Sequence, residues 1–160
     1  MLADAGMTEL QSSVPLAETA LLKGLETEQC AQVLTVLTEQ RLAAGELLFQ
    51  EGDAGDAIYV VTEGSISIAA TWTPERQRAS ALSPFPRGMM FGETAMLDGR
   101  GRTAAAVADC ASVVYRLDRT AFERLSATDP QLGQRLALNI AVHLAERLRG
   151  ASMAWRASAG

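Results

Sequence analysis

Residues 47–66 have the sequence LLFQEGDAGDAIYVVTEGSI, in which short apolar runs alternate with glycine and aspartate. The runs Leu47–Phe49 and Ile58–Val61 are rich in strand-forming side chains, and Ser65–Ala69 alternates polar and apolar residues as a half-buried strand does. Glycine accepts the positive φ values that tight turns need, and aspartate bonds its own backbone there. The segment therefore predicts consecutive short strands joined by tight turns.

The same pattern of strand and turn continues toward the C-terminus. Further strands are predicted at 78–82, 103–108 and 112–117. We expect exposed loops at Pro74, Pro84 and Pro86, because proline punctuates regular structure and cannot donate to a strand ladder. Short strands at roughly ten-residue spacing with Gly or Pro turns are typical of an antiparallel barrel or jelly roll.

Helical patterns flank the predicted strands. Short helices are expected over Leu16–Lys23 and Thr27–Leu37, and another begins after Asp118, a good N-cap. Asp129-Pro130 predicts the start of a long helix, with aspartate as cap and proline in the first turn, and Gly150 is its expected end. The apolar stripe of this helix consists of Leu132, Leu136, Ile140, Leu144 and Leu148. We expect one domain over residues 15–150, a flexible lead-in over 1–14 and a tail over 151–160.

Residues 91–104, FGETAMLDGRGRTA, contain the groups that binding of a sugar phosphate requires. A carboxylate accepts hydrogen bonds from hydroxyls, and a guanidinium grips phosphate oxygens with paired N–H groups. Glycine lets the backbone come close to a ligand. If Thr94–Leu97 form one helical turn, the free N–H groups of that turn face the anion as well.

Composition and charge exclude several function classes. The chain has 160 residues, a formal net charge of −5 and a pI near 4.9, whereas a nucleic-acid surface normally carries a clustered basic excess. No stretch approaches 18 consecutive apolar residues, and the N-terminus lacks the basic start and apolar run of a signal peptide. Cys30 and Cys110 are isolated in the sequence, which favours two reduced, mostly buried thiols. We expect a cytoplasmic protein.

Catalytic patterns are missing from the sequence. His143 is the single histidine, and no carboxylate or cysteine lies at metal-ligand spacing from it. No nucleophile, base and orienting group form a recognisable set. We therefore expect neither catalysis nor a metal or cofactor, and we expect His143 to be a surface or packing residue.

Two segments, 47–66 and 91–104, resemble the cyclic nucleotide-binding domain family, that of the bacterial cAMP receptor protein and the protein kinase A regulatory subunits. The first is similar to the early strand, glycine turn and aromatic strand of the family, and the second to its phosphate-binding cassette. With the flanking helices, the resemblance covers about residues 16–150. It implies a mainly β fold, an antiparallel, jelly-roll-like β-roll with N-terminal helices and a long C-terminal helix, and a pocket for cAMP or cGMP inside the roll.

The resemblance also implies roles for the residues of the cassette. Glu93 would bind the ribose 2′-hydroxyl and Arg102 the cyclic phosphate, because the spacing between them matches the kinase-type cassette. The backbone N–H groups of Thr94 and Ala95 would assist, and the Thr103 hydroxyl could reach the phosphate or the guanine amino group of cGMP. The expected ligand-binding set is Phe91, Gly92, Glu93, Thr94, Ala95, Arg102, Thr103 and Ala104.

The sequence departs from the family pattern at two positions in the cassette. Gly101 replaces a proline often found before the arginine, and Arg100 adds a second positive charge nearby. Contacts to the base from the last helix vary in the family, and Leu144, Arg147 and Leu148 are the positions to consider here.

Alternatives stay open for the cassette and for the apolar stripe on the last helix. Glu93 and Arg102 could form an ion pair inside a turn, and the chain would then be a nucleotide-free interaction scaffold of the same fold. The stripe on the last helix could pack on the roll, move when ligand binds, or pair with a second copy. A buried arginine needs an anionic partner, so either a phosphate or Glu93 must supply that charge.

The output of such a sensor depends on what it is attached to. About ten residues follow Gly150, too few for a helix-turn-helix, so we expect no nucleic-acid binding and no membrane insertion. We expect a regulatory domain that binds cAMP more readily than cGMP and moves its C-terminal helix. It would act through a homodimer, a partner, or fusion to a larger effector.

Overall fold

The computed structural model describes residues 15–69, 72–73, 78–79 and 82–160. Its helical elements are the 3₁₀ turn η1 (Leu16–Glu18), α2 (Thr27–Leu34), α3 (Glu93–Asp98), α4 (Arg119–Thr128) and α5 (Pro130–Ala159). Its strands are β1 (Thr38–Leu42), β2 (Leu47–Phe49), β3 (Ala57–Glu63), β4 (Ser65–Ala69), β5 (Trp72–Thr73), β6 (Arg78–Ala79), β7 (Leu82–Pro86), β8 (Met90–Phe91), β9 (Ala105–Ala108) and β10 (Ser112–Asp118).

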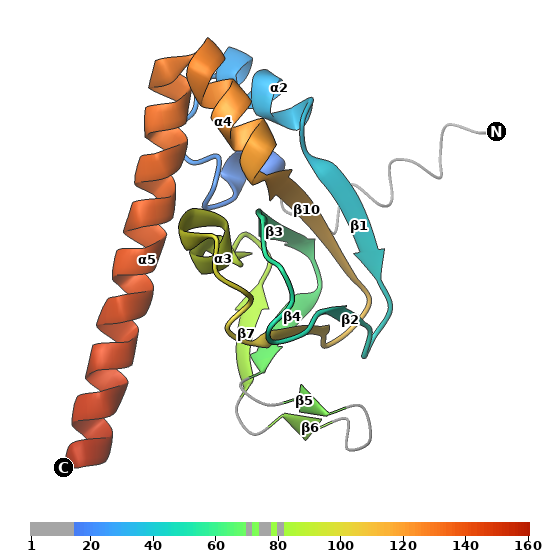
Figure 1. Ribbon diagram of the computed structural model, residues 1–160, viewed down its shortest axis with the longest axis vertical. Coiled ribbons are helices and arrows are strands. Elements are labelled where there is room, and N and C mark those ends of the chain that lie inside the picture. Colours follow the sequence, from blue (N-terminus) through green and yellow to red (C-terminus); the bar gives the residue numbers. More distant parts are fainter. Residues whose placement is uncertain (1–14, 70–71, 74–77, 80–81) are drawn as a thin grey trace.

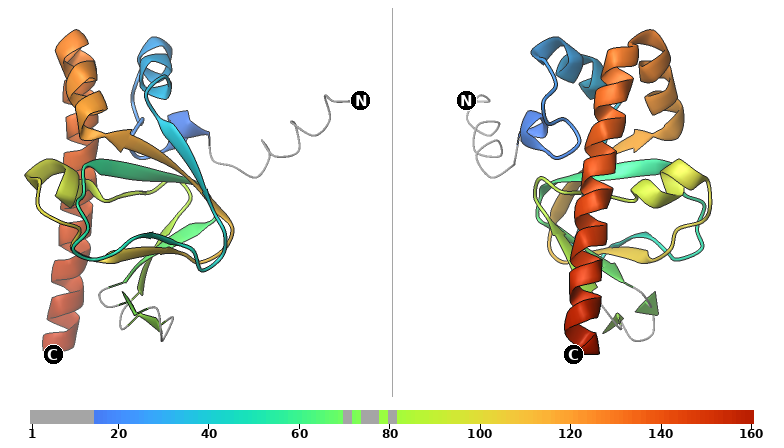
Figure 2. Two further views of the ribbon diagram at one scale, coloured as in Figure 1. Left: turned by 45° about the vertical axis from the view of Figure 1, so that its right-hand side comes forward. Right: turned by 90° about the vertical axis from the view of Figure 1, so that its left-hand side faces the viewer.

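Two antiparallel sheets form the β-roll. One has the strand order β1-β10-β3-β8 and the other β2-β9-β4-β7, while β5 and β6 pair as a separate hairpin. Helix α5 runs along the outside of the roll, and α2 and α4 gather at one end of it (Figures 1 and 2). The predicted roll with flanking helices is confirmed.

Strand β3 is buried on both faces and joins the two hydrophobic clusters of the molecule. Because side chains alternate along a strand, Ile58 and Val60 pack toward the helices, against Leu132, Leu136 and Ile140 of α5 among others. Ala57, Tyr59 and Val61 point into the roll. The helices and the roll therefore share one central strand.

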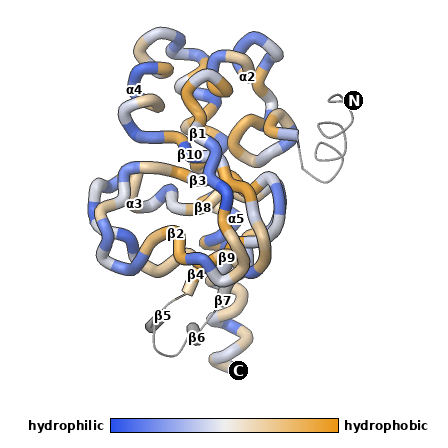
Figure 3. Tube along the Cα trace, turned by 90° about the vertical axis from the view of Figure 1, so that its right-hand side faces the viewer, coloured by the Kyte–Doolittle hydropathy of each residue, from blue (hydrophilic) through white to orange (hydrophobic). Residues whose placement is uncertain are grey.

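Strand β1 was not predicted from the sequence. Four of its five residues are polar, and Figure 3 colours it hydrophilic along most of its length. It lies at a sheet edge and pairs with β10, from Thr38 opposite Arg116 to Leu42 opposite Ser112. Helix α2 was expected to continue to Leu37 but ends at Leu34. The pairing of β1 explains this difference, because the chain must be extended by Thr38.

The helix expected over Leu16–Lys23 is wrong beyond its first turn. Only the 3₁₀ turn η1 forms, and the Ala20 amide donates to the Gly88 carbonyl instead of continuing a helix. The backbone there is attached to the roll, and Leu21 and Leu22 are buried in the core.

The expectations that prolines would mark loops and that a glycine would end the last helix are also wrong. Pro84 and Pro86 lie within β7, an edge strand of its sheet where a missing N–H is tolerated. Gly150 does not end α5, which continues to Ala159. A helical glycine costs only about 1 kcal/mol relative to alanine, and the alanine-rich residues after it favour helix.

Other expectations can be compared directly. Strands β9 and β10 and helix α4 form where they were predicted, and Asp129 caps α5 by accepting a hydrogen bond from the Leu132 amide. The strand expected at 78–82 corresponds to β6 and the first residue of β7, and residues 80–81 between them lie outside the described residues. The expected lead-in over 1–14 and the loop at Pro74 also lie outside them.

The two cysteines are free, as expected, but they differ in burial. Cys30 is half-buried, and Cys110, expected to be mostly buried, is exposed in the turn between β9 and β10. Within the described ranges, no helix combines the length and the apolar character needed to cross a bilayer.

Candidate functional site

Helix α3 is the single helical turn expected in the 91–104 segment. It is bounded by two glycines in the left-handed region, Gly92 at φ 83° and Gly99 at φ 70°. A side chain at Gly92 would be strained there, and its Cβ would lie 2.8 Å from Nη1 of Arg102. Gly92 is therefore the position where the strand β8 turns sharply and the Arg102 side chain passes close to the backbone.

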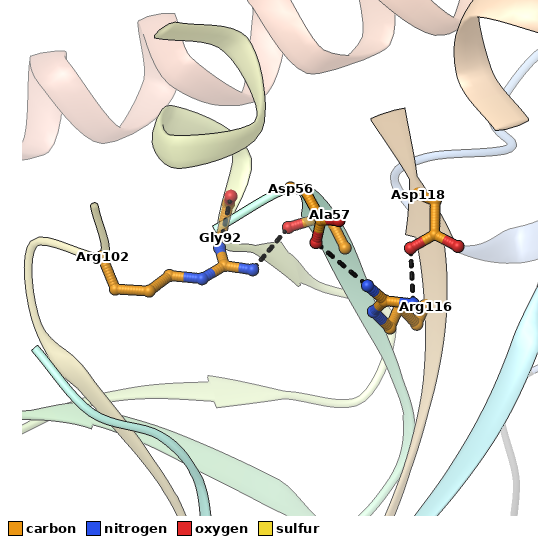
Figure 4. Close-up of polar contacts among 6 residues, drawn as sticks. All are labelled: Asp56, Ala57, Gly92, Arg102, Arg116 and Asp118. Carbon is orange, nitrogen blue, oxygen red and sulfur yellow. Dashed lines mark hydrogen bonds and ion pairs between the residues drawn. The ribbon is translucent and has the colours of Figure 1, made fainter. Parts of the chain in front are cut away.

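Arg102 is held in place by the backbone of several other segments. Its N–H donates to the Asp53 carbonyl, and its carbonyl accepts from the Gly52 amide, both at 2.8 Å. Its guanidinium donates from Nη1 to the Gly92 carbonyl and from Nη2 to the Ala57 carbonyl, each at 2.9 Å (Figure 4). The glycine turn of the first motif thus fixes the arginine of the second.

The charge of Arg102 is buried without a carboxylate. The residue is 5% exposed, its guanidinium carbon lies 4.3 Å from the centroid of the Phe49 ring, and burial lowers the pKa of the guanidinium. No ion pair joins it to an acid in the described part of the chain, and its buried Nε–H has no acceptor there. Two carbonyls and an aromatic face compensate the cation only partly.

The acid that adjoins the Ala57 acceptor of Arg102 is engaged elsewhere. Asp56 precedes Ala57, but its carboxylate accepts from Nη2 of Arg116 at 3.0 Å (Figure 4). Asp118 lies 2.5 Å from Nη1 of the same arginine. Two carboxylates therefore neutralise Arg116, and neither pairs with Arg102.

Glu93 also has a different partner from the one considered in the sequence. The side chain is fully buried, and its Oε1 accepts a charged hydrogen bond from Nη1 of Arg147 on α5. Its Oε2 is buried without a hydrogen-bond partner. Arg147 also lies over the Phe85 ring, with 5.2 Å between the guanidinium carbon and the ring centroid. The ion pair between Glu93 and Arg102, the alternative to a ligand, does not form.

These groups surround a cavity of about 50 Å³. Its lining residues are Phe49, Ile68, Phe91, Gly92, Thr94, Ala95, Arg102, Thr103, Ala104 and Arg147. Of the expected ligand-binding set, only Glu93 is not part of the lining, but its ion-pair partner Arg147 is. Arg100 is exposed and does not line the cavity.

The sequence did not single out Phe49 or Ile68 as part of a site. Phe49 belonged to a predicted strand, and only the fold brings its ring under the Arg102 guanidinium. Among the positions considered on the last helix, Arg147 lines the cavity, Leu144 packs on the core, and Leu148 is 69% exposed. An aromatic residue just before a glycine turn is the one sequence feature that could have indicated Phe49.

His143 is a packing residue beside this site. It is 3% exposed, its Nε2 has no hydrogen-bond partner, and its ring centroid lies 6.4 Å from that of Phe85. The pKa of His143 is lowered overall, and burial is the largest cause. The charge of Arg147 also lowers this pKa, whereas the charges of Glu93 and Glu146 and a hydrogen bond with the Met90 backbone raise it. The imidazole is therefore kept neutral at the interface between α5 and the roll.

Comparison with known proteins identifies the family to which the chain belongs. The model of the cyclic nucleotide-binding domain matches residues 39–129, more than half of the chain. The chain belongs to this family. The match includes both motifs described above, from β1 to the end of α4.

Curated relatives carry the domain as a small part of longer chains. Glutaminase 1 of Bradyrhizobium diazoefficiens is 29% identical over 89% of this chain, which corresponds to 22% of that protein. The cGMP-dependent protein kinase isozyme 1 of Drosophila melanogaster is 32% identical over 75% of this chain and 16% of that protein. The chain thus spans about a fifth of these relatives.

Solved structures share the fold over most of the chain. The catabolite activator protein of Thermus thermophilus is 30% identical, with a TM-score of 0.72 over 88% of this chain and 63% of that chain. The N-terminal domain of a transcriptional regulator from Streptomyces coelicolor is 29% identical, with a TM-score of 0.68 over 88% of this chain and 94% of that chain. The β-roll and the helices around it are therefore the common part.

Proposed function

We propose that the cavity next to α3 binds a cyclic nucleotide, cAMP or cGMP, and that the domain is a regulatory sensor. The observation that carries this proposal is the buried charge of Arg102. Leaving a cation in the interior without a paired anion costs several kcal/mol, and the acids that surround it are bound to Arg116 and Arg147. An entering phosphate would supply the missing negative charge.

The remaining groups of the site suit the other parts of such a ligand. The orphaned Oε2 of Glu93 would accept a hydrogen bond from the ribose 2′-hydroxyl. The backbone N–H groups of Thr94 and Ala95 and the hydroxyl of Thr103 would contact the phosphate, and Phe91, Gly92 and Ala104 would form the walls. Thr103 fits cGMP without disfavouring cAMP, and the likeness to bacterial regulators inclines us to cAMP.

Isothermal titration with cAMP and cGMP tests this proposal. We expect micromolar or tighter binding to the wild type, loss of binding in Arg102→Ala, and unchanged binding in the control Arg100→Ala, because Arg100 is exposed and outside the cavity. Circular dichroism should show the same fold for all three proteins. No heat with either nucleotide would refute the proposal and favour a nucleotide-free interaction scaffold.

A thermal shift assay gives the same answer through stability. Ligand at a hundred times its Kd stabilises the folded state by about 2.7 kcal/mol, which corresponds to several degrees for a domain of this size. An unchanged melting temperature with both nucleotides would again favour the scaffold.

We further propose that the domain senses and does not catalyse. A bound nucleotide can shift a conformational equilibrium only if it prefers one state, and α5, which contributes Arg147 to the cavity, is the element best placed to respond. The domain would work in the cytoplasm and pass the signal to an effector, as its occurrence in longer relatives suggests. Any activity of the whole protein would then belong to that effector.

Helix α5 also offers a surface for pairing with a second copy or a partner. Leu132, Leu136 and Ile140 of the predicted stripe are buried in the domain, so they are not available for this. Leu148 of the stripe is exposed, as are Leu138, Val142, Met153 and Trp155 at other positions of α5. Sedimentation with and without nucleotide tests the pairing, and a monomer in both conditions would refute the homodimer.

A further inference from the structure

We propose that Arg147 closes the cavity and competes with the nucleotide for Glu93, so that the ion pair between α5 and α3 must open before ligand can bind. The inference rests on the proposed function and adds the regulation of that site. It is based on the ion pair between Glu93 and Arg147. The Glu93 carboxylate, which is expected to bind the ribose, is already bound by Arg147 of the last helix.

The first argument is the space available. Ligand pockets typically measure about 300–1,000 Å³, whereas this cavity measures about 50 Å³. A wall must therefore move for a nucleotide to enter. Arg147 is one of the lining residues, and it is the only contribution of α5 to that lining.

The second argument is how firmly each wall is held. Phe49, Ile68 and Phe91 lie on strands β2, β4 and β8, which are hydrogen-bonded to neighbouring strands. Arg102 is fixed through four hydrogen bonds of its backbone and guanidinium. Among the described residues, the Arg147 side chain is held by its ion pair with Glu93 and by its contact with Phe85, so it can move without disturbing a strand or the Arg102 contacts.

The third argument is the asymmetry of the ion pair. The Arg147 side chain is 42% exposed and can return to water, whereas the Glu93 side chain is fully buried and cannot. A buried carboxylate left without a partner is costly, so the pair opens only transiently and closes again unless another donor takes the place of Arg147. Only one Glu93 oxygen is used in the pair, which leaves Oε2 as the position where a hydroxyl can begin this exchange.

The position of Arg147 along α5 determines which part of the helix is released. Leu144, three residues earlier, is the last side chain of α5 that packs on the core. Beyond it Leu148, Met153 and Trp155 are between 67% and 72% exposed. Breaking the contact with Glu93 therefore frees the C-terminal part of α5 and leaves its N-terminal part packed.

Arg147→Gln tests the competition, with Arg149→Gln as the matched control on an exposed position two residues away. We expect cAMP and cGMP to bind Arg147→Gln about 2- to 5-fold more tightly than the wild type, because the variant no longer holds Glu93. Arg149→Gln should bind as the wild type does. Equal or weaker binding in Arg147→Gln would overturn the inference, and weaker binding would mean that Arg147 supports the bound ligand.

A measurement without nucleotide separates this inference from the proposed function. Amide hydrogen exchange of residues 145–159 should be faster in Arg147→Gln than in wild type and Arg149→Gln. Equal exchange would overturn the closing role of Arg147, whatever the titrations show. Faster exchange together with no nucleotide binding by any of the three proteins would refute the proposed function and the competition, and would leave Arg147 as a contact that only holds α5.

Discussion

Replacing Gly92 by alanine should weaken nucleotide binding, and Gly88→Ala provides the matched control for the backbone strain. Both glycines are in the left-handed region, at φ 83° and φ 88°. An alanine in this conformation costs about 1–2 kcal/mol. At about 2–4 °C per kcal/mol for a chain of this size, this strain alone should lower the melting temperature of each variant by about 2–8 °C.

The two variants differ in what the new methyl group meets. At Gly88 nothing lies within 4 Å of the added Cβ, whereas at Gly92 it would lie 2.8 Å from Nη1 of Arg102 and 3.3 Å from the Ala57 carbonyl oxygen. Nη1 donates to the Gly92 carbonyl, so the guanidinium must leave that hydrogen bond to make room. A hydrogen bond to a charged group contributes about 1.5–3 kcal/mol, so displacing the guanidinium from its place should lower affinity about 10- to 150-fold.

Titration calorimetry and thermal melts on the same preparations measure both effects. In the absence of nucleotide, we expect Gly92→Ala to lose more stability than Gly88→Ala, because only Gly92→Ala also displaces the Arg102 guanidinium from its hydrogen bond. Only Gly92→Ala should lose affinity for cAMP and cGMP, whereas Gly88→Ala should bind as the wild type does. If both variants bind equally well, the placement of Arg102 by the Gly92 backbone does not set the affinity, and the reasoning is wrong.

Two further predictions concern the stability of the fold. Gly64→Ala should be more destabilising than Gly45→Ala in urea unfolding. Both glycines have positive φ, but only at Gly64 would the added Cβ approach the Ala111 carbonyl oxygen, at 2.5 Å. Equal losses of unfolding free energy in the two variants would contradict this close approach. Because burial lowers the pKa of His143, the unfolded chain binds the extra proton first, so stability should fall as the pH drops below about 6.5, by at most about 1.4 kcal/mol per pH unit. His143→Gln should flatten this part of the profile, and an unchanged slope would show that other groups cause it.

Elements whose pattern is local could be predicted from the sequence. The β3 segment shows its apolar run and its turn glycines within 20 residues, and α5 begins at an aspartate and a proline that are adjacent in the chain. Strand β1 could not be predicted, because its residues are mostly polar and its partner β10 lies more than 70 residues later. Edge position, which permits Pro84 and Pro86 in β7, is likewise a property of the assembled sheet.

The residues of the candidate site also fall into those that could be predicted from the sequence and those that could not. The segment 91–104 contains most of the cavity lining, and its spacing was enough to choose Arg102 over Arg100 as the phosphate-binding residue, a choice that stays a prediction. The partner of Glu93 could not be predicted, because Arg147 is 54 residues away and reaches it only through the packing of α5. The ring under Arg102 comes from β2 for the same reason.

The length of α5 has a geometric consequence. At 1.5 Å per residue, the segment from Leu144 to Ala159 is about 22 Å long. A tilt of about 10° at Leu144 would displace its far end by about 4 Å. Under the exchange proposed above, helix α5 would act as a lever arm, converting the replacement of one arginine by one hydroxyl into a movement at its far end.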